Sequence, residues 1–348
     1  MASDYTTPES LAALSKVDPE IALLLPTLPP SPTTNISMRQ MNATHATNMP
    51  SIIGNVDQSE LRKIPMRDGY MNEIRTYGPK KGKSLETVPL FILICGGGFV
   101  NADNKWLNPY ARAISALYDT TVVSISYRCA PKFKFPFAAN DAWDSLEWIT
   151  SHAAELGANP VAGLVLGGVS AGANLAAVTC QKSVSEKFSP PLTGLWLGQP
   201  FILDEEIVPQ GYKPLFISRR DNQNAPLLND AMIRYAYDQA AFDVHSPKFS
   251  PFNATNPHIG MPPTYIQVCG LDPLRDDGLI YERALRENGV STRMDVYSGV
   301  PHGHYAAWPY AATSRKWDFD VVSSAGWLLD TPADPACIII ALDGRHGP

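Results

Sequence analysis

Short apolar runs alternate with helical patterns along most of this chain, and this alternation limits its fold more than any other feature. Residues 90–94 (LFILI) are wholly apolar and residues 121–126 (TVVSIS) are largely β-branched, which is typical of buried strands. Residues 109–117, between these two runs, have helical spacing. The alternation continues to about residue 330 and predicts a mostly parallel sheet with helices on both faces.

The same patterns predict further elements on either side of this region. Asp68-Gly69 is a turn between two expected strands, and Pro65 makes the first of them an edge strand. Further strands are expected at residues 64–66, 71–77, 163–166, 192–197, 265–269 and 293–297. Further helices are expected at residues 137–154, 171–184, 278–288 and 317–329.

Two segments depart from the alternation. The N-terminal segment is rich in Pro, Thr, Ser and Asn and has only two short helical patches, around residues 11–14 and 21–25, which indicates a loose flap. A later segment lacks clear strands and contains one amphipathic helix near residues 230–242, which indicates an insertion. We therefore expect four segments: an N-terminal flap (1–60), a core (61–200), an insertion (201–250) and the C-terminal part of the core (251–348).

The composition excludes several classes of function. The formal net charge is −6, with no basic stripe that would bind nucleic acid and no apolar run long enough to span a membrane. The first residues lack the basic start and apolar run of a secretory signal. The 5 cysteines are scattered without a CxxC pair, which is typical of reduced thiols rather than of a disulfide framework or a zinc site. We expect a cytoplasmic protein.

The strongest chemical signal is the pentapeptide GVSAG at residues 168–172, which follows one expected strand and opens the next helix. Its glycines allow a sharp turn, so that Ser170 is presented at the carboxyl end of the strand. The N-terminus of the helix behind the serine favours developing negative charge. This context predicts a nucleophilic serine.

A nucleophilic serine needs a base, and the base needs an acid that orients it. Asp272 follows the expected strand 265–269, and His302 follows the next strand along the chain, so both lie at the same edge of the sheet as Ser170. Asp276 and Asp277 are rival acids, for which helix capping is the alternative explanation. His304 is the rival base. We prefer His302 because it is nearer the strand end and is flanked by Pro and Gly.

Three successive glycines follow the strand at residues 90–94, in the sequence CGGGF. Without Cβ atoms, their backbone N–H groups can approach the oxyanion of a tetrahedral intermediate. A phosphate-binding loop also uses glycines, but neither GxGxxG nor a following Lys-Ser/Thr is present. The glycines therefore favour an oxyanion hole.

Taken together, these motifs resemble the hormone-sensitive-lipase-like family of esterases, which have the α/β-hydrolase fold. The similarity covers roughly residues 62–330. The family's HGGGF, YRLAPE, GDSAGGNLA, acid segment and HGF are matched by CGGGF (95–99), YRCAPK (127–132), GVSAGANLA (168–176), DPLRD (272–276) and HGH (302–304).

The resemblance implies that the N–H groups of Gly97, Gly98 and Ala171 form the oxyanion hole. It also implies that the N-terminal segment and the insertion form a cap over the acyl pocket, and that the substrate is a small-molecule ester. Neither a metal nor an organic cofactor is implied. Dimers recur in this family, so a homodimer is left open.

The chain departs from the family pattern at several positions near the site. Cys95 replaces the motif's histidine, which in the family organises the glycine loop and does not attack the substrate. Val169 replaces an acidic residue, Ala173 replaces a glycine, and His304-Tyr305 replaces an apolar pair. These changes affect loop rigidity and substrate choice more than the triad, and they suggest a specialised enzyme, such as one from fungal natural-product biosynthesis.

We therefore predict a serine carboxylic-ester hydrolase that works through an acyl-enzyme on Ser170. An acyltransferase, a thioesterase or a lactone hydrolase would use the same intermediate, and the sequence does not separate them. A non-catalytic ligand-binding relative, like the plant gibberellin receptor that lost its base, is disfavoured because all three triad residues are present. The aromatic residues expected to line the pocket are Phe99, Trp106, Phe201, Tyr212, Phe216 and Trp308.

Overall fold

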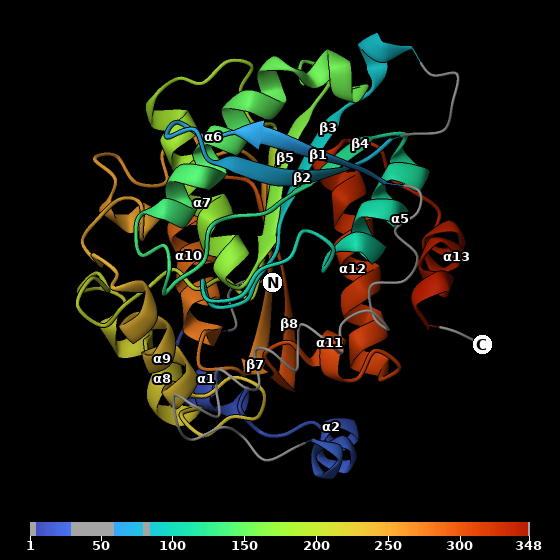
Figure 1. Ribbon diagram of the computed structural model, residues 1–348. Helices are drawn as coiled ribbons and strands as arrows, with labels where there is room; N and C mark the ends of the chain where they lie inside the picture. Colours follow the sequence, from blue (N-terminus) through green and yellow to red (C-terminus); the bar gives the residue numbers. More distant parts are fainter. Residues whose placement is uncertain (1–4, 29–58, 79–83, 347–348) are drawn as a thin grey trace.

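An eight-stranded sheet forms the centre of the molecule, with the strand order β1-β2-β4-β3-β5-β6-β7-β8 (Figure 1). The computed structural model describes residues 5–28, 59–78 and 84–346, so much of the expected flap lies outside the described residues. The strands are β1 (Glu60–Pro65), β2 (Met71–Tyr77), β3 (Leu90–Ile94), β4 (Thr121–Ile125), β5 (Leu164–Val169), β6 (Gly194–Gly198), β7 (Thr264–Leu271) and β8 (Thr292–Pro301).

The sheet is parallel from β4 through β3 to β8, and antiparallel only where β2 pairs with β1 and β4. Every residue of β3, β4, β5, β6 and β7 is buried, as expected for parallel strands covered on both faces. β1, which contains Pro65, lies at the edge of the sheet, where a missing N–H costs no ladder bond. The predicted fold class is confirmed.

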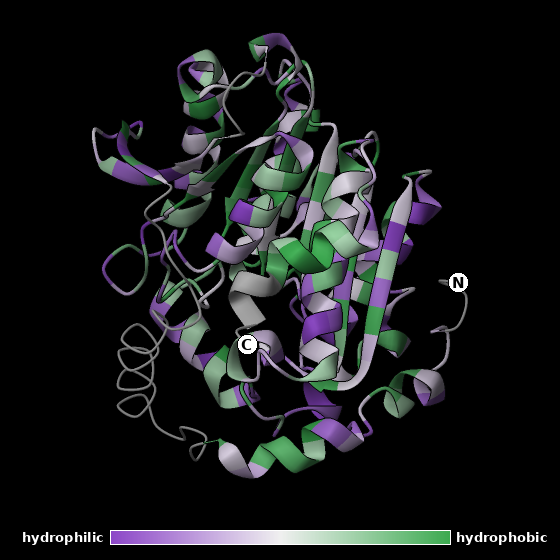
Figure 2. Ribbon diagram, turned by 90° about the vertical axis from the view of Figure 1, so that its right-hand side faces the viewer, coloured by the Kyte–Doolittle hydropathy of each residue, from purple (hydrophilic) through white to green (hydrophobic). Residues whose placement is uncertain are grey.

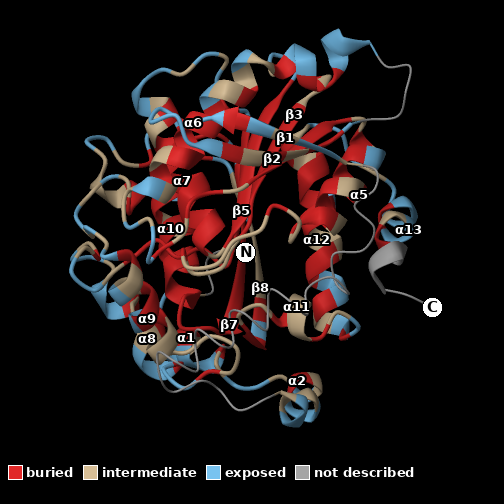
Figure 3. Cartoon of the chain, in the orientation of Figure 1, coloured by how far each residue is buried: buried red, intermediate tan, exposed pale blue. Residues whose placement is uncertain are grey.

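Helices cover both faces of the sheet. α6, α7 and α10 lie on one face, and α5 and α12 lie on the other, with α13 packed against α5 (Figure 1). The buried strands and the hydrophobic sides of these helices together form the core (Figures 2 and 3). The longer helices are α5 (Asn108–Tyr118), α6 (Phe137–Ser151), α7 (Ala171–Ser185), α9 (Asp230–Ala240), α10 (Arg275–Glu287), α12 (Ala312–Leu328) and α13 (Pro335–His346).

Four short or medium helices lie at the end of the molecule where β7 and β8 finish (Figure 1). Two of them, α1 (Pro8–Ala13) and α2 (Pro19–Leu24), belong to the N-terminal segment. The other two, α8 (Ser218–Asp221) and α9, belong to the expected insertion. α11 (His304–Ala307) follows β8 directly. Segments far apart in the sequence therefore meet around the carboxyl ends of the strands.

The structure differs from the sequence expectations mainly at element ends. α10 begins at Arg275, three residues before the expected start, and β8 continues to Pro301. α13 was not expected. Ile338 and Leu342 of this helix are buried, but Ile339 and Ile340 between them are exposed, which obscures the helical period. Within the described ranges, no helix combines the length and the hydropathy needed to cross a bilayer.

His258 gives the fold a testable dependence on pH. Its ring is only 4% exposed and packs edge-on against Phe252 and Tyr281, and burial lowers its pKa to about 4. The pKa in the unfolded chain is about 6.5. Protonation therefore favours the unfolded chain, so this contribution to stability is complete above about pH 6.5 and is lost as the pH falls towards 4.

The free energy of unfolding falls between pH 7.5 and pH 5. We expect this fall to be about 2 kcal/mol smaller in His258→Phe than in wild type. Urea unfolding at the two pH values measures this difference. His245→Phe is the control, because the His245 side chain is 67% exposed. An equal pH dependence in wild type and His258→Phe would contradict the account.

Candidate active site

Ser170 lies in the sharp turn that joins β5 to α7. Its backbone has φ 57° and ψ −121°, a conformation that costs energy for a residue with a side chain. A Cβ on Gly172 would lie 2.1 Å from the carbonyl oxygen of Ile94, and a Cβ on Gly168 would lie 2.4 Å from that of Gly172. Only glycines allow α7 to pass this close to the end of β3, and this approach fixes the turn.

Ser170, His302 and Asp272 form one hydrogen-bonded chain. Nε2 of His302 lies 3.0 Å from Oγ of Ser170, and its Nδ1 lies 2.7 Å from Oδ2 of Asp272. Oδ1 of Asp272 accepts a hydrogen bond of 2.8 Å from the N–H of Leu274, so both carboxylate oxygens are held. Because the carboxylate accepts from Nδ1, the Nε2 lone pair faces the serine hydroxyl. This geometry suits removal of the hydroxyl proton.

The rival base occupies a different environment. His304 is fully buried, with Nδ1 2.9 Å from Oγ of Ser314 and its ring edge-on to Trp317. It therefore lies in the core beneath α12, whereas His302 faces the serine.

The rival acids hold the insertion to the core. Oδ2 of Asp276 accepts the N–H groups of residues 217–218 at 2.7 and 2.6 Å, and Oδ1 of Asp277 accepts those of residues 202–203 at 2.8 and 2.9 Å. Arg219 forms an ion pair of 3.1 Å with Asp277, which opposes the rise of the Asp277 pKa to about 6 caused by burial. The expectation that these carboxylates cap α10 was wrong, since that helix begins without a side-chain cap.

The glycine loop after β3 lies beside the serine. Gly97 and Gly98 have φ values of 114° and 60°, and a Cβ on Gly96 would lie 3.1 Å from Cβ of Ser170. The Tyr127 hydroxyl donates to the carbonyl oxygen of Gly96 at 3.0 Å and so steadies the loop. In the described part of the chain, the N–H groups of Gly97, Gly98 and Ala171 have no protein acceptor. These three amides are therefore available to a ligand oxygen.

Cys95 begins the glycine loop but is 2% exposed, and burial raises the pKa of its thiol well above the ordinary range. A buried neutral thiol is a poor nucleophile. Cys129 and the backbone of Asp103 lie near its sulfur, and its carbonyl oxygen faces Gly172 and the Tyr127 hydroxyl.

The six aromatic residues that were expected to line the pocket do not form one group. Trp106 contacts the glycine loop, since a Cβ on Gly97 would lie 3.0 Å from its Cζ3. Phe99 is part of this loop, and its ring centroid lies 6.1 Å from that of Phe201. The Phe216 ring lies under the Arg219 guanidinium at 5.3 Å, on the insertion.

The other two aromatics form hydrogen bonds with distant parts of the chain. The Tyr212 hydroxyl donates to Oε2 of Glu287, the last residue of α10. Glu287 is roughly 18 Å along that helix from the loop that carries Asp272, named here the acid loop. We therefore withdraw Tyr212 as a pocket residue. Trp308 is buried, and its Nε1 donates to Oγ1 of Thr27 at 3.0 Å, so it holds the N-terminal segment.

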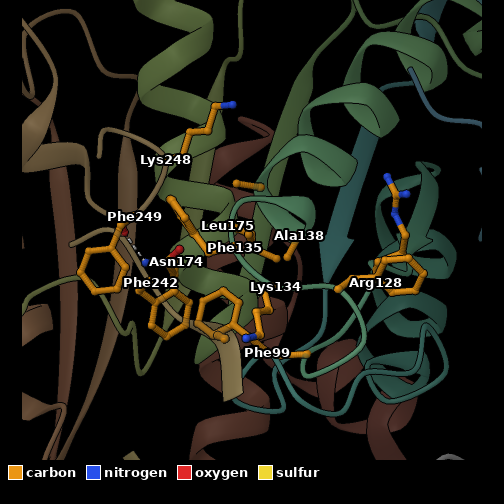
Figure 4. Close-up of a pocket in the computed structure, with 14 residues that line it drawn as sticks. Phe99, Arg128, Lys134, Phe135, Ala138, Asn174, Leu175, Phe242, Lys248 and Phe249 are labelled. Atoms are coloured by element: carbon orange, nitrogen blue, oxygen red, sulfur yellow. Dashed lines mark hydrogen bonds between the residues drawn. The ribbon is translucent and has the colours of Figure 1, made fainter. Parts of the chain in front are cut away.

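A narrow cavity lies next to the glycine loop (Figure 4). Phe99 forms one wall, and neither Ser170 nor His302 lines the cavity. Asn174, one turn after the serine on α7, donates both to Phe201 O (2.6 Å) and to Phe249 O (2.7 Å). The cavity is therefore the aromatic support of the glycine loop rather than the space above the serine. Its labelled residues are Phe99, Arg128, Lys134, Phe135, Ala138, Asn174, Leu175, Phe242, Lys248 and Phe249.

The structure also shows supporting residues that sequence reasoning missed. Oε1 of Gln199 accepts the N–H of Gly303 at 3.1 Å, and so supports the loop that carries His302, named here the base loop. Nδ2 of Asn222 donates to the carbonyl oxygens of Gly270 (3.1 Å) and Asp272 (2.9 Å), and so supports the acid loop. Gln199 directly follows β6, at the carboxyl end of that strand, and this position could have indicated a role at the site. Asn222 belongs to the insertion and carries no local signal.

The fold and the geometry of this site are those of the α/β-hydrolase class, and comparison with known proteins agrees. Residues 91–306 match the family model described as alpha/beta hydrolase fold. The AB hydrolase superfamily protein B1A11.02 of Schizosaccharomyces pombe is 34% identical over 76% of this chain and 78% of its own. Esterase LipI of Mycobacterium tuberculosis is 32% identical over 73% and 79%, respectively.

Among solved structures, vibralactone cyclase superposes with a TM-score of 0.81 and 29% identity, over 91% of this chain and 96% of that one. The chain therefore belongs to the alpha/beta hydrolase family, in its hormone-sensitive-lipase-like group of esterases. It is an ester-hydrolysing type of enzyme, as the motifs predicted.

The burial of Cys95 leads to a prediction about thiol reactivity. We expect iodoacetamide at pH 8 to alkylate Cys337, which is exposed, and to leave Cys95 unmodified in the native protein. Peptide mass mapping reads out both sites. Cys95→Ala should lose no more than about 10-fold in kcat, less than the ~100-fold loss of an oxyanion donor. Rapid alkylation of Cys95 with parallel loss of activity would show that this thiol takes part in the chemistry.

Proposed function

We propose that this protein hydrolyses carboxylic esters of small molecules through an acyl-enzyme on Ser170, with His302 as the base and Asp272 as the acid that orients it. The observation that carries the proposal is the chain of hydrogen bonds, 3.0 and 2.7 Å long, that links the three side chains. The amides of Gly97, Gly98 and Ala171 are proposed as the oxyanion hole.

The proposed cycle has two acyl-transfer steps. Oγ of Ser170 attacks the ester carbonyl carbon while Nε2 of His302 takes the hydroxyl proton, and the carbonyl oxygen gains the negative charge. The tetrahedral intermediate then expels the alcohol, which takes the proton from His302. Water next attacks the acyl-enzyme, giving its proton to His302, and the acid leaves as Ser170 recovers a proton. Each step of the proposed cycle thus uses the three triad side chains, the backbone amides of the oxyanion hole, or water.

The N-terminal segment (1–60) and the insertion (201–250) are proposed as a two-part cap, with residues 61–200 and 251–348 as the hydrolase core. α9 of the insertion reaches the glycine loop, because a Cβ on Gly98 would lie 3.9 Å from Cβ of Ala236. Phe99 and Trp106 flank the same loop, so the acyl group is proposed to bind among these residues. This enclosure favours short acyl chains.

A second candidate is intramolecular acyl transfer, in which a hydroxyl of the substrate attacks the acyl-enzyme and a lactone leaves. Similarity to vibralactone cyclase favours this candidate, with 29% identity and a TM-score of 0.81. Both candidates share every step up to the acyl-enzyme and differ only in the nucleophile that His302 activates next.

The roles of the triad predict distinct kinetic losses. With p-nitrophenyl acetate, Ser170→Ala should reduce activity to the uncatalysed rate, and Asp272→Asn should lower kcat by about 10⁴-fold, because the imidazole loses its orienting partner. Ser185→Ala, at the other end of α7, is the control and should keep wild-type kcat. A Ser170→Ala protein that stays active would overturn the proposal.

The fate of the acyl group separates transfer to water from transfer to a hydroxyl, the step that the second candidate requires. We expect p-nitrophenyl acetate to hexanoate to give mainly free acid, even with millimolar primary alcohols present, because water is the acceptor in the proposed cycle. The ratio of acid to new ester, measured by gas chromatography, checks this. A burst of p-nitrophenol that stalls until an alcohol is added would instead support acyl transfer to a hydroxyl.

A further inference from the structure

Residues 11–18, which comprise the end of α1 and its connection to α2, are seated directly on the ends of β7 and β8. The N–H of Gly299 donates to the carbonyl oxygen of Leu14 at 2.7 Å, and the N–H of Asp18 donates to that of Gly299 at 3.1 Å. The connection between the two N-terminal helices thus pairs by backbone hydrogen bonds with the end of β8. This is a closer attachment than side-chain packing alone.

Two glycines make this seat possible. A Cβ on Gly299 would lie 2.2 Å from the carbonyl oxygen of Lys16 and 2.4 Å from the nitrogen of Asp18. A Cβ on Gly270, in β7, would lie 2.2 Å from the carbonyl oxygen of Leu14 and 2.8 Å from the nitrogen of Gly299. Ordinary contacts of a Cβ begin at about 3.4 Å. Any side chain at either position would therefore push the N-terminal segment off the strands.

The two glycines directly precede the acid and base loops. Gly270 lies two residues before Asp272, and Gly299 lies three residues before His302. The segment is anchored a third time on the acid side, where NH1 of the fully buried Arg275 donates to the Leu11 carbonyl oxygen and to Oγ of Ser15, both at 2.8 Å. One short stretch of chain thus contacts the residues that flank both loops.

We propose that residues 11–18 act as a clamp that fixes the spacing between Asp272 and His302, and that Gly270 and Gly299 are positioning residues for catalysis. This inference rests on the proposed function, because it concerns the 2.7 Å contact between Asp272 and His302. Displacing the clamp frees β8 between Tyr297 and Pro301, where its pairing with β7 is irregular, and shifts the loop that carries His302 away from Asp272. The imidazolium then loses carboxylate stabilisation, which weakens the transition state.

The test compares Gly299→Ala with Gly289→Ala. Both glycines have left-handed backbones, with φ 71° and 78°, but a Cβ on Gly289 meets nothing within 4 Å. The pair therefore shares the cost of the backbone conformation and differs in the clash with the clamp. With p-nitrophenyl acetate, we expect Gly299→Ala to lower kcat by about 10- to 100-fold with KM within about 3-fold, and Gly289→Ala to stay within about 2-fold of wild type.

A double variant separates positioning from a general loss of structure. Because the clamp acts through the contact between Asp272 and His302, Gly299→Ala should cost no more than about 2-fold in kcat once Asp272→Asn has removed that contact. Circular dichroism establishes that each variant is folded. A folded Gly299→Ala with wild-type kcat, or with the same loss of kcat in both backgrounds, would overturn the clamp.

Ser15→Ala decides the matter if Gly299→Ala does not fold. It removes one anchor from Arg275 at a site away from the strands, and should lower kcat by about 2- to 5-fold, with little further loss in the Asp272→Asn background. Unchanged kcat would then overturn the clamp. An active Ser170→Ala enzyme would instead overturn the proposed function, whatever the glycine variants do.

Discussion

The tight packing of α7 against the end of β3 is the contact on which the rest of the site depends. Gly172 approaches Ile94 O and Cys95 O so closely that no Cβ fits between them. This contact forces Ser170 into its strained turn and brings the glycine loop alongside it. The positions of Ser170 and of the glycine loop beside it therefore depend on this close approach of two backbones. Burial on both faces of the parallel strands holds this contact rigid (Figure 3).

The other half of the site depends on polar contacts from segments outside the sheet. Asp276 and Asp277 hold the insertion to α10 through backbone amides, and Asn222 returns a hydrogen bond to the carbonyl oxygen of Asp272. The N-terminal segment approaches the same loops at Gly270 and Gly299. The segments proposed as a cap are thus also the supports of the acid and base loops. We therefore expect a change in either segment to affect catalysis as well as substrate access.

Much of this architecture could be predicted from the sequence, because its signals are local. The strand ends that carry Ser170, Asp272 and His302 follow from short apolar runs and from the glycine and proline residues beside them. Long-range contacts had no such signal. Asp276 and Asp277 resembled helix caps in sequence, but their partners lie some 60 to 75 residues away. Tyr212 was misplaced for the same reason, since its partner Glu287 lies 75 residues further along the chain.

The central claim is that an acyl group passes through Ser170. The most direct measurement is acid quenching of the enzyme within milliseconds of mixing with p-nitrophenyl acetate, followed by mass mapping of its peptides. The account predicts one acetyl group, an increase of about 42 Da, on the peptide that carries Ser170, and its disappearance as substrate is exhausted. An acetyl group on Cys95, or turnover without any acylated peptide, would contradict the account.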